Sequence, residues 1–487
     1  MADLLVKNGI VLTVNETFEV IPDGAIAITD ARIEAVGETD EVVDRTDTDR
    51  IVDAAGKLVF PGLITSHVHV SDILLRGVCS DRDDWLYNVK IPGVGAMEPD
   101  DHALGSALYC TEAVRSGITT FVENAVATGS GYSDEVIEAK LDVYETAGIR
   151  NVYAQAFRDR LPSQAFLDSV ESVTSRAPSV NHVPIETTVK DTDEALSNIE
   201  DLIRSYHGTA DGRQSIWPTP YITWSTTKEG FRGAYELADK YDVMTTTHVS
   251  QAPQEDEGYL TSVEHLRNVG YLGERTLLGH CIHLSERDIR ILSETDTRVA
   301  HNPLTNLYIG RGFAPVPTML RYGVTVGLGT DNTSASNTVN MINDLRYGAL
   351  IHKASYEDPG ATTARKALEM ATIDNARAIG REEDLGSIEP GKLADIVVMD
   401  LDYPHLTPHH HDVVSALVYQ AQGFEVETVI CNGEVVLEHG RMAGLDDEFP
   451  DLRPAAAASA ERVIDRAGLE EYRAESRPYD IDITPAE

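Results

Sequence analysis

The sequence predicts an α/β fold, a (β/α)8 TIM barrel with a small discontinuous β-sandwich domain built from both chain ends. Between residues 59 and 385, apolar β-branched runs alternate with helix-like segments eight times, which is typical of this barrel. Residues 1–58 and 386–445 instead contain short alternating strands separated by turn residues. The alternative, an open doubly wound sheet, would need a Gly-rich nucleotide loop after an early strand, and none is found.

The expected elements follow this division. The first domain begins with strands at 2–14, 24–37 and 50–60, and its C-terminal part contributes strands within 386–400 and 426–440. The barrel strands are expected at 57–69, 117–125, 150–157, 217–224, 243–250, 275–284, 297–303 and 324–331. Helical patterns lie between them, as at 101–117, 133–148 and 227–242. Residues 446–487 predict a C-terminal helix and an acidic tail.

Composition excludes several classes of partner. The chain has 80 acidic and 40 basic residues, a net charge of −40, so nucleic acid and anionic membranes should be repelled. The acid is spread along the chain, which favours a surface of the halophilic type, where salt screens self-repulsion. No apolar run reaches transmembrane length, and no signal peptide is recognised. The four cysteines lie far apart, as in cytoplasmic proteins.

Polar residues fall at the ends of four predicted barrel strands. His67 and His69 end the first, and residues two apart on a strand point to one face. His248, His280 and Asp331 end the fifth, sixth and eighth strands. Barrel enzymes keep their active sites at this rim. Imidazole and carboxylate ligands suit Zn²⁺, with Fe²⁺ as the alternative, and an open position would hold the water that the metal activates.

Several motifs together resemble the amidohydrolase superfamily, in the branch of cytosine, guanine and adenosylhomocysteine deaminases and triazine hydrolases. They are PGLITSHVHVSDILLRG, LLGHCIHLSERDI, VAHNPLTNLYIGRGFAPV, GVTVGLGTDNTSASN and GSIEPGKLADIVVMD. The resemblance implies one metal held by His67, His69, His248 and Asp331, with His280 beside the attacking water or the substrate. No lysine stands in the fourth strand, WPTPYITW, where two-metal members carry one. It also implies a homo-oligomer.

Gln251 departs from the pattern of that branch. The family's deaminases have His-x-x-Glu after the fifth strand, and the glutamate transfers protons, whereas an amide can only orient a substrate. Three interpretations remain open. Asp331 and His280 could manage the protons while Gln251 orients the ring. Glu255 or Glu257 could replace the missing carboxylate, although a solvated loop is the simpler reading. The leaving group could need little protonation, as for chloride or a thiolate.

The sequence therefore predicts a cytoplasmic metal-dependent hydrolase that attacks an sp² ring carbon and deaminates a purine, pyrimidine or triazine-like small molecule. The alternatives are a hydrolytic dechlorinase and, in another class, an inactive scaffold. Catalytic residues would be Asp331, His280 and Gln251. Candidate substrate-binding residues, each equally explained by packing, are Trp85, Arg158, Asn306 and Tyr308. The histidine-rich run PHLTPHHHD (404–412) is expected to be an exposed loop, and Cys281 to pack against helices.

Overall fold

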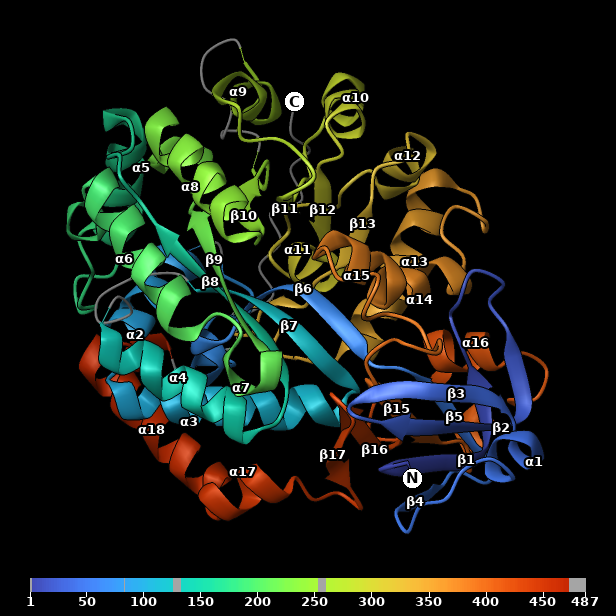
Figure 1. The fold of residues 1–487 in the computed structure, drawn as a ribbon. Coiled ribbons are helices and arrows are strands. Elements are labelled where there is room, and N and C mark those ends of the chain that lie inside the picture. The colour runs from blue at the N-terminus through green and yellow to red at the C-terminus, as the bar shows by residue number, and fades with distance from the viewer. Residues whose placement is uncertain (1, 83, 126–132, 253–259, 473–487) are drawn as a thin grey trace.

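The computed structural model describes residues 2–82, 84–125, 133–252 and 260–472 of the 487-residue chain. In Figure 1 a sheet built from both chain ends lies beside a larger α/β part that carries most of the helices. None of the helices in these ranges combines the length and apolar character needed to span a membrane.

The two chain ends form one mixed eight-stranded sheet, in the order β17-β16-β15-β5-β1-β2-β3, with β4 paired to β1. Its strands are β1 (Leu4–Leu12), β2 (Val20–Thr29), β3 (Arg32–Glu38), β4 (Ile51–Asp53), β5 (Lys57–Pro61), β15 (Ile396–Asp400), β16 (Val426–Cys431) and β17 (Glu434–Glu438). β15 lies antiparallel to β5, which joins the C-terminal strands to the N-terminal ones. The expected sandwich is thus a single hydrogen-bonded sheet, and its buried apolar side chains, such as Val6, Ile26 and Ile396, form their own core.

The larger part contains two parallel sheets. One has the order β14-β6-β7-β8-β9 and the other β10-β11-β12-β13. Their strands are β6 (Leu63–His69), β7 (Ile118–Ala125), β8 (Arg150–Phe157), β9 (Gln214–Pro220), β10 (Thr245–Val249), β11 (Thr276–His280), β12 (Arg298–His301), β13 (Val326–Leu328) and β14 (Asp331–Asn332). The expected run 57–69 divides at Gly62, so that β5 belongs to the end sheet and β6 to the parallel sheet.

The hydrogen-bonded ladder of these strands is not continuous, unlike that of the closed barrel expected from the sequence. Between β9 and β10 the described residues form only the isolated bridge of Ile222 with His248. β9 contains Pro218 and Pro220, which lack the N–H that a ladder needs. The eighth expected strand is also split. β13 pairs with β12, whereas β14 pairs with β6, so Asp331 stands on a separate short segment beside His67 and His69.

Helices follow the parallel strands and cover their outer side (Figure 1). In α8, the buried residues Phe231, Ala234 and Ala238 recur at helical spacing. The side chain of Thr227 caps its first turn, and Asp242 ends it in the left-handed conformation.

The helices of this part are α2 (Ile91–Gly95), α3 (Pro99–Arg115), α4 (Asp134–Thr146), α5 (Gln164–Thr174), α6 (Thr192–Tyr206), α7 (Thr209–Gly212), α8 (Lys228–Tyr241), α9 (Ser262–Val269), α10 (Glu286–Glu294), α11 (Pro303–Tyr308), α12 (Val316–Arg321), α13 (Met341–Tyr356), α14 (Ala364–Ala371) and α15 (Ile373–Ala378). Two short helical segments, η1 (Ser71–Leu75) and η2 (Trp85–Lys90), lie between β6 and α2. The others are α1 (Thr39–Val43), α16 (Val413–Ser415), α17 (Ala443–Glu448) and α18 (Leu452–Ala467).

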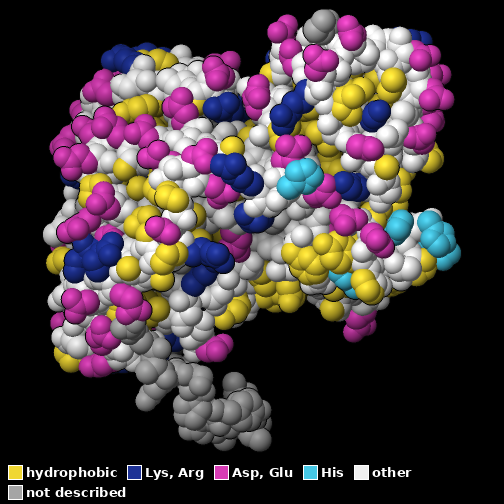
Figure 2. Space-filling model, turned by 90° about the horizontal axis from the view of Figure 1, so that it is seen from below, with side chains coloured by type: hydrophobic (Ala, Val, Ile, Leu, Met, Phe, Trp, Pro, Cys, Tyr) yellow, Lys and Arg dark blue, Asp and Glu magenta, His cyan; other side chains and the backbone are white. Residues whose placement is uncertain are grey.

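The predicted C-terminal helix is α18, which is anchored to α3 by a hydrogen bond of 2.5 Å from Ser459 Oγ to Asp101 Oδ1. The predicted acidic tail beyond residue 472 lies outside the described residues. Figure 2 shows Asp and Glu side chains spread over one face of the molecule, with Lys and Arg side chains between them. The negative charge is therefore dispersed on this face rather than gathered in one patch.

Candidate metal centre and active site

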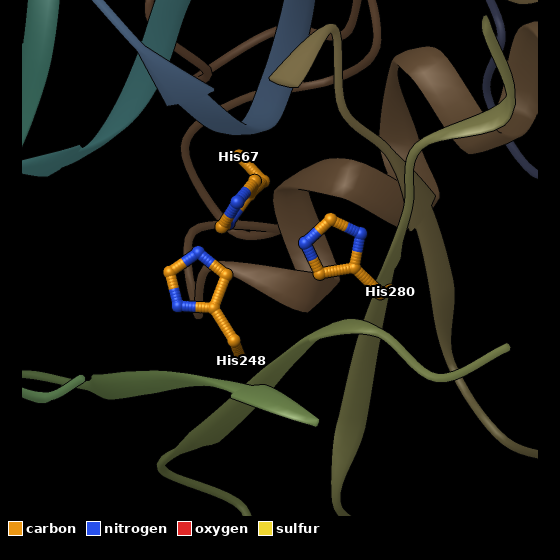
Figure 3. A group of neighbouring side chains, drawn as sticks. All are labelled: His67, His248 and His280. Atoms are coloured by element: carbon orange, nitrogen blue, oxygen red, sulfur yellow. The ribbon is translucent and has the colours of Figure 1, made fainter. Parts of the chain in front are cut away.

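The polar residues singled out at strand ends come together at one place. His67 and His69 end β6, His248 lies on β10, His280 ends β11 and Asp331 begins β14. All five side chains are buried. Parallel strands bring their carboxyl ends to one edge, so residues 264 positions apart in sequence become neighbours. In Figure 3 the rings of His67, His248 and His280 face one another across a shared space.

The backbone at this rim is bent in the left-handed region. His280 has a φ of 73° and Asp331 a φ of 54°, a conformation that few residues with a side chain adopt. Two glycines make room for His67. A Cβ added to Gly279 would lie 3.1 Å from His67 Cε1, and one added to Gly329 would lie 2.9 Å from His67 Cβ. The glycines beside His280 and Asp331 therefore allow these strands to approach the imidazole of His67.

The ligand atoms form two overlapping triads that share His67. One triad is His67, His248 and His280, the other His67, His69 and Asp331, with the ligand atoms of each within 4.8 Å of one another. Nε2 of His67 and Nε2 of His69 both lie 3.5 Å from Asp331 Oδ1. A tetrahedral ion with bonds of about 2.0–2.1 Å separates its ligands by roughly 3.3–3.4 Å. The donor set and its spacing therefore fit a divalent metal ion.

Two histidines are oriented by backbone carbonyls. His69 Nδ1 lies 2.8 Å from the carbonyl oxygen of Asn124, and His248 Nδ1 lies 2.8 Å from that of Tyr221. Because a carbonyl only accepts, both Nδ1 atoms carry the proton, and both Nε2 atoms have a bare lone pair. These lone pairs face each other, with the Nε2 atoms 3.3 Å apart. A cation shared between them removes the repulsion, and this is the strongest structural argument for a metal here.

Protonation states also suit metal binding. Burial is the main cause that places the pKa of His69 and of His248 well below the usual value, and burial lowers that of His280 to about 4. These imidazoles are therefore neutral near pH 7. Burial alone would raise the pKa of Asp331, but His280 and His67 hold it well below its usual range, so the carboxylate is ionised. Both ring nitrogens of His67 are buried without a hydrogen-bond partner.

Two of the predicted catalytic residues occupy different environments. His280 is backed by Asn306, whose Oδ1 lies 3.0 Å from His280 Nδ1. Asn306 is fully buried. Its contact with His280 explains the position of its side chain without a bound substrate. Gln251 follows β10 and is partly exposed. Glu255 and Glu257, its possible replacements, lie outside the described residues.

The other predicted substrate-binding residues do not join the histidine cluster. Arg158 is buried, donates to Thr188 Oγ1 over 3.1 Å and stacks on the ring of Tyr221. Tyr308 is exposed and accepts a hydrogen bond from Asn337 Nδ2 over 2.9 Å. Trp85 is buried at the start of η2. Arg158 still lies close to the centre, because Tyr221 is the residue whose carbonyl orients His248.

Sequence reasoning missed the polar residues around the centre. Asp72, three residues after His69, is fully buried and accepts hydrogen bonds from Thr333 Oγ1 over 2.6 Å and from Ser334 Oγ over 3.0 Å. Lys90 pairs with the same carboxylate. The position of Asp72 three residues after the His-x-His motif was the one available signal. The partners come from distant segments and carry no motif.

The weaker candidates occupy ordinary positions. His405 in the histidine-rich run lies 2.6 Å from Glu425 Oε1, and His409 to His411 belong to no cluster of metal-ligand type in the described ranges. Cys281 is buried within the main apolar core.

Comparison with known proteins identifies the family. The family model described as Amidohydrolase family matches residues 58–436. The chain belongs to the amidohydrolase family. It is 34% identical over 443 residues to a 5'-deoxyadenosine deaminase of Methanothermobacter thermautotrophicus, covering 89% of this chain and 94% of that protein. It is 37% identical over 329 residues to an S-triazine hydrolase of Gordonia rubripertincta, covering 67% of this chain and 68% of that one.

Solved structures agree with this assignment. An adenosine deaminase from Xanthomonas campestris with bound zinc superposes with a TM-score of 0.83 at 26% identity, covering 95% of this chain and 98% of that one. The zinc complex of an atrazine chlorohydrolase from Arthrobacter aurescens reaches 0.79 at 25% identity, covering 94% and 100%. The predicted membership in this amidohydrolase branch is confirmed. The chain is a metal-dependent amidohydrolase acting on non-peptide carbon–nitrogen bonds, as the sequence predicted.

Proposed function

We propose that this amidohydrolase removes an amino group from a purine-like or triazine-like ring and replaces it with oxygen. The observation that carries the proposal is the pair of lone pairs on His69 and His248, 3.3 Å apart beside an ionised Asp331. The relatives support the substrate class, since those compared are named for a deoxyadenosine, an adenosine and triazines.

We assign the metal to His67, His69, His248 and Asp331, with His280 beside it and one Zn²⁺ per chain. Fe²⁺ would suit the same ligands. When bound, such a metal lowers the pKa of a water molecule to about 7 and makes it a nucleophile. Asp331, an ionised carboxylate at this centre, would accept the proton that the water loses. It would then return the proton to the departing amine, while the second proton of the water ends on the ring nitrogen, so that water and the amino compound become the oxo compound and ammonia.

Gln251 limits how protons can be transferred in this site. Its amide can donate a hydrogen bond to a ring nitrogen or accept one from an amino group, but it cannot transfer a proton. The single proton acceptor of the reaction is then Asp331, while neutral His280 orients the water or the ring. A second candidate function follows from the same residue, since a chloride leaving group needs no proton, and the chain resembles an atrazine chlorohydrolase.

A coupled assay distinguishes these functions. Protein purified in high salt and loaded with Zn²⁺ would be incubated with adenosine, 5'-deoxyadenosine, aminotriazines, cytosine and pterins, with ammonia measured. The same protein would be incubated with chlorotriazines, with chloride measured. Ammonia release that disappears in Asp331→Asn supports deamination. Chloride release without ammonia would replace it with dechlorination. Neither product from metal-loaded protein would contradict both and favour an inactive scaffold.

We further propose a closed (β/α)8 barrel, a cytoplasmic location and a homo-oligomer. The pairing of β14 with β6 supports closure at one seam, and the bridge of Ile222 with His248 supports it at the other. The four cysteines are buried and form no disulfide in the described part of the chain, which suits a reducing compartment. Analytical ultracentrifugation in high salt tests the oligomer.

A further inference from the structure

A cavity lies at the rim of the parallel strands opposite the metal centre. Its volume of about 340 Å³ falls within the range of pockets that hold small molecules, roughly 300–1,000 Å³. Its lining includes Arg150, Gln214 and Arg298, which begin β8, β9 and β12. His248 and His280, in contrast, lie towards the carboxyl ends of β10 and β11. Because these strands run parallel, the cavity and the metal centre occupy opposite ends of this part of the molecule, and none of the five residues of the centre lines the cavity.

Arginine dominates the charge of this cavity. The charged residues of its lining that concern an anion are four arginines and two acids, namely Arg150, Arg275, Arg298, Arg381, Asp242 and Glu274. Both acids are exposed, so water screens them, and Asp242 is already paired with Arg275 at 2.8 Å. Such an excess of arginine stands out in a chain with a net charge of −40. The lining therefore favours a negatively charged ligand.

Arg298 has no acidic partner among the described residues. Its guanidinium makes no ion pair there, and Nη1 instead lies 3.8 Å from Sδ of Met244, a weak acceptor. Gly380 lies beside the same guanidinium with a φ of 69°, and a Cβ added to it would lie 3.5 Å from Arg298 Nη1. Arg298 is partly exposed, so a ligand that enters from solvent can reach its N–H donors.

Two further arginines of the lining are only partly neutralised. Arg381 Nη2 lies 3.1 Å from Asp384 Oδ2, but Arg32 Nη1 lies 3.1 Å from the other oxygen of the same carboxylate. Arg150 Nη2 lies 3.3 Å from Asp395 Oδ1, and its Nε is buried without a hydrogen-bond partner. Burial, and next the charge of Arg150, lower the pKa of Arg381. The two guanidiniums thus repel each other, and an anion beside them would relieve this repulsion.

Two neutral side chains of the lining have unused hydrogen-bonding atoms. Asn151 is fully buried, and neither its Nδ2 nor its Oδ1 has a partner in the described part of the chain. Thr120 is also fully buried, and its Oγ1 has no partner there either. Thr120 is paired with Arg150 between β7 and β8, so these side chains occupy neighbouring positions. Because buried amides and hydroxyls are normally hydrogen-bonded, a polar ligand is expected here.

We propose that this cavity binds a phosphate group, either free or as the ester of a small metabolite. Arg298 and Arg381 supply charge-assisted hydrogen bonds, since a guanidinium matches two oxygens of a phosphate. Asn151 and Thr120 donate to the remaining oxygens, and Asn151 Oδ1 accepts from a protonated phosphate oxygen or from a hydroxyl of the ester. The cavity is larger than a phosphate ion, which leaves space for an organic group. The site lies away from the metal centre and does not depend on the proposed deamination.

Calorimetric titration of the Zn²⁺-loaded protein with inorganic phosphate, at pH 7 and constant ionic strength, tests the site. One ion should bind per chain. Arg298→Met and Asn151→Leu should each weaken binding by about tenfold or more, the usual value of a hydrogen bond to a charged group. Arg453→Met, on an exposed arginine of α18, is the matched control and should bind as wild type.

The outcomes of this titration separate the cavity from other places where phosphate could bind. Weakening in either cavity variant, with the control unchanged, places the ion in the cavity. Binding that is unchanged in both variants would place the phosphate elsewhere, for example at the metal centre, and would overturn the proposal. No binding by the wild-type protein would mean that water alone fills the cavity, and it would also overturn the proposal.

A chemical measurement on the wild-type protein replaces any variant that does not fold. Phenylglyoxal modifies accessible arginines, and mass spectrometry locates the modified residues. Phosphate should protect Arg298 and Arg381 from modification and leave Arg453 reactive. Equal reactivity of Arg298 with and without phosphate would overturn the proposal.

Ribose 5-phosphate and ribose determine the source of the phosphate group. Tighter binding of ribose 5-phosphate than of inorganic phosphate, lost in Arg298→Met, would support an ester as the ligand. Tighter binding of the free ion would support inorganic phosphate. Ribose that binds as tightly as its phosphate would overturn a phosphate site. Because binding is measured without turnover, failure of the deamination assay would leave these results unaffected.

Discussion

Oδ1 of Asn306 lies 3.0 Å from Nδ1 of His280, and both side chains are fully buried. This contact is shorter than the 3.3 Å between His280 Nδ1 and Asn302 Nδ2, so we assign the proton to Nδ1, with the amide oxygen of Asn306 as its acceptor and the other ring nitrogen keeping its lone pair. Asn306 is therefore placed to select the tautomer of His280, although it stands on α11, in a different strand–helix unit.

Asn306→Leu should lower kcat about tenfold to a hundredfold, the usual cost of removing a partner that orients a site histidine. Metal content should stay unchanged, because Asn306 contacts none of the four proposed ligands. Steady-state kinetics with atomic emission analysis of the metal checks both results, and Asn198→Leu on α6 is the control. Unchanged kcat would show that this contact does not matter for turnover.

His248→Ala should remove both metal and activity. The substitution deletes one of the two lone pairs that share the cation and leaves His69 without its counterpart. Wild-type protein should purify with about one ion per chain. The exposed His439 gives the matched control, His439→Ala, which should keep both. Activity that survives in His248→Ala would place the metal elsewhere.

Gln251→Glu should raise the rate of deamination. A carboxylate at this position would supply a general acid–base, which is typically worth about a hundredfold to ten-thousandfold. We expect the lower end, since Asp331 already moves protons. The kcat for ammonia release is compared with that of Gln164→Glu on the exposed start of α5. A slower Gln251→Glu enzyme would mean that the amide itself recognises the substrate.

His102 should make the fold sensitive to acid. Burial, and next the charge of Lys140, lower the pKa of His102 to about 3, against about 6.5 in the unfolded chain. Below pH 6.5 the unfolded chain therefore binds a proton that the folded chain does not. The free energy of unfolding falls as the pH falls, by about 1.4 kcal/mol per unit from this group.

Urea unfolding of wild type and His102→Gln at pH 7 and pH 5 measures this contribution. The variant should lose about 2 kcal/mol less than wild type between these values, whatever its stability at pH 7. His439→Gln should behave as wild type, because that side chain is exposed. If His102→Gln and wild type lost the same free energy of unfolding between pH 7 and pH 5, His102 would not contribute to the acid sensitivity of the fold.

The parallel strands and the five polar residues at their ends could be predicted because both are local properties. Runs of β-branched residues form strands. When the strands are parallel, the polar residues that end them lie together at one rim of the sheet. His67, His69, His248, His280 and Asp331 could be named for this reason. The family could be named because its motifs lie within continuous segments of the sequence.

The break at Gly329 and Thr330, which separates β13 from β14, could not be predicted. It depends on the left-handed turn at Asp331 and on the space that His67 occupies beside Gly329. Asn306 was assigned to a substrate pocket because it follows a strand end, but its depth behind His280 depends on how α11 packs. Sequence spacing contains no information about that packing.

The sequence by itself determined the chemistry available to this protein, namely a set of imidazoles, one carboxylate and the amide of Gln251. Only the tertiary structure decided which groups share a space. It brought Nε2 of His69 to 3.3 Å from that of His248, and it placed Lys90 against Asp72 beside them. The physical reason is that pairwise electrostatics and hydrogen bonds act over a few ångströms, and those distances are set by packing between segments far apart in the chain.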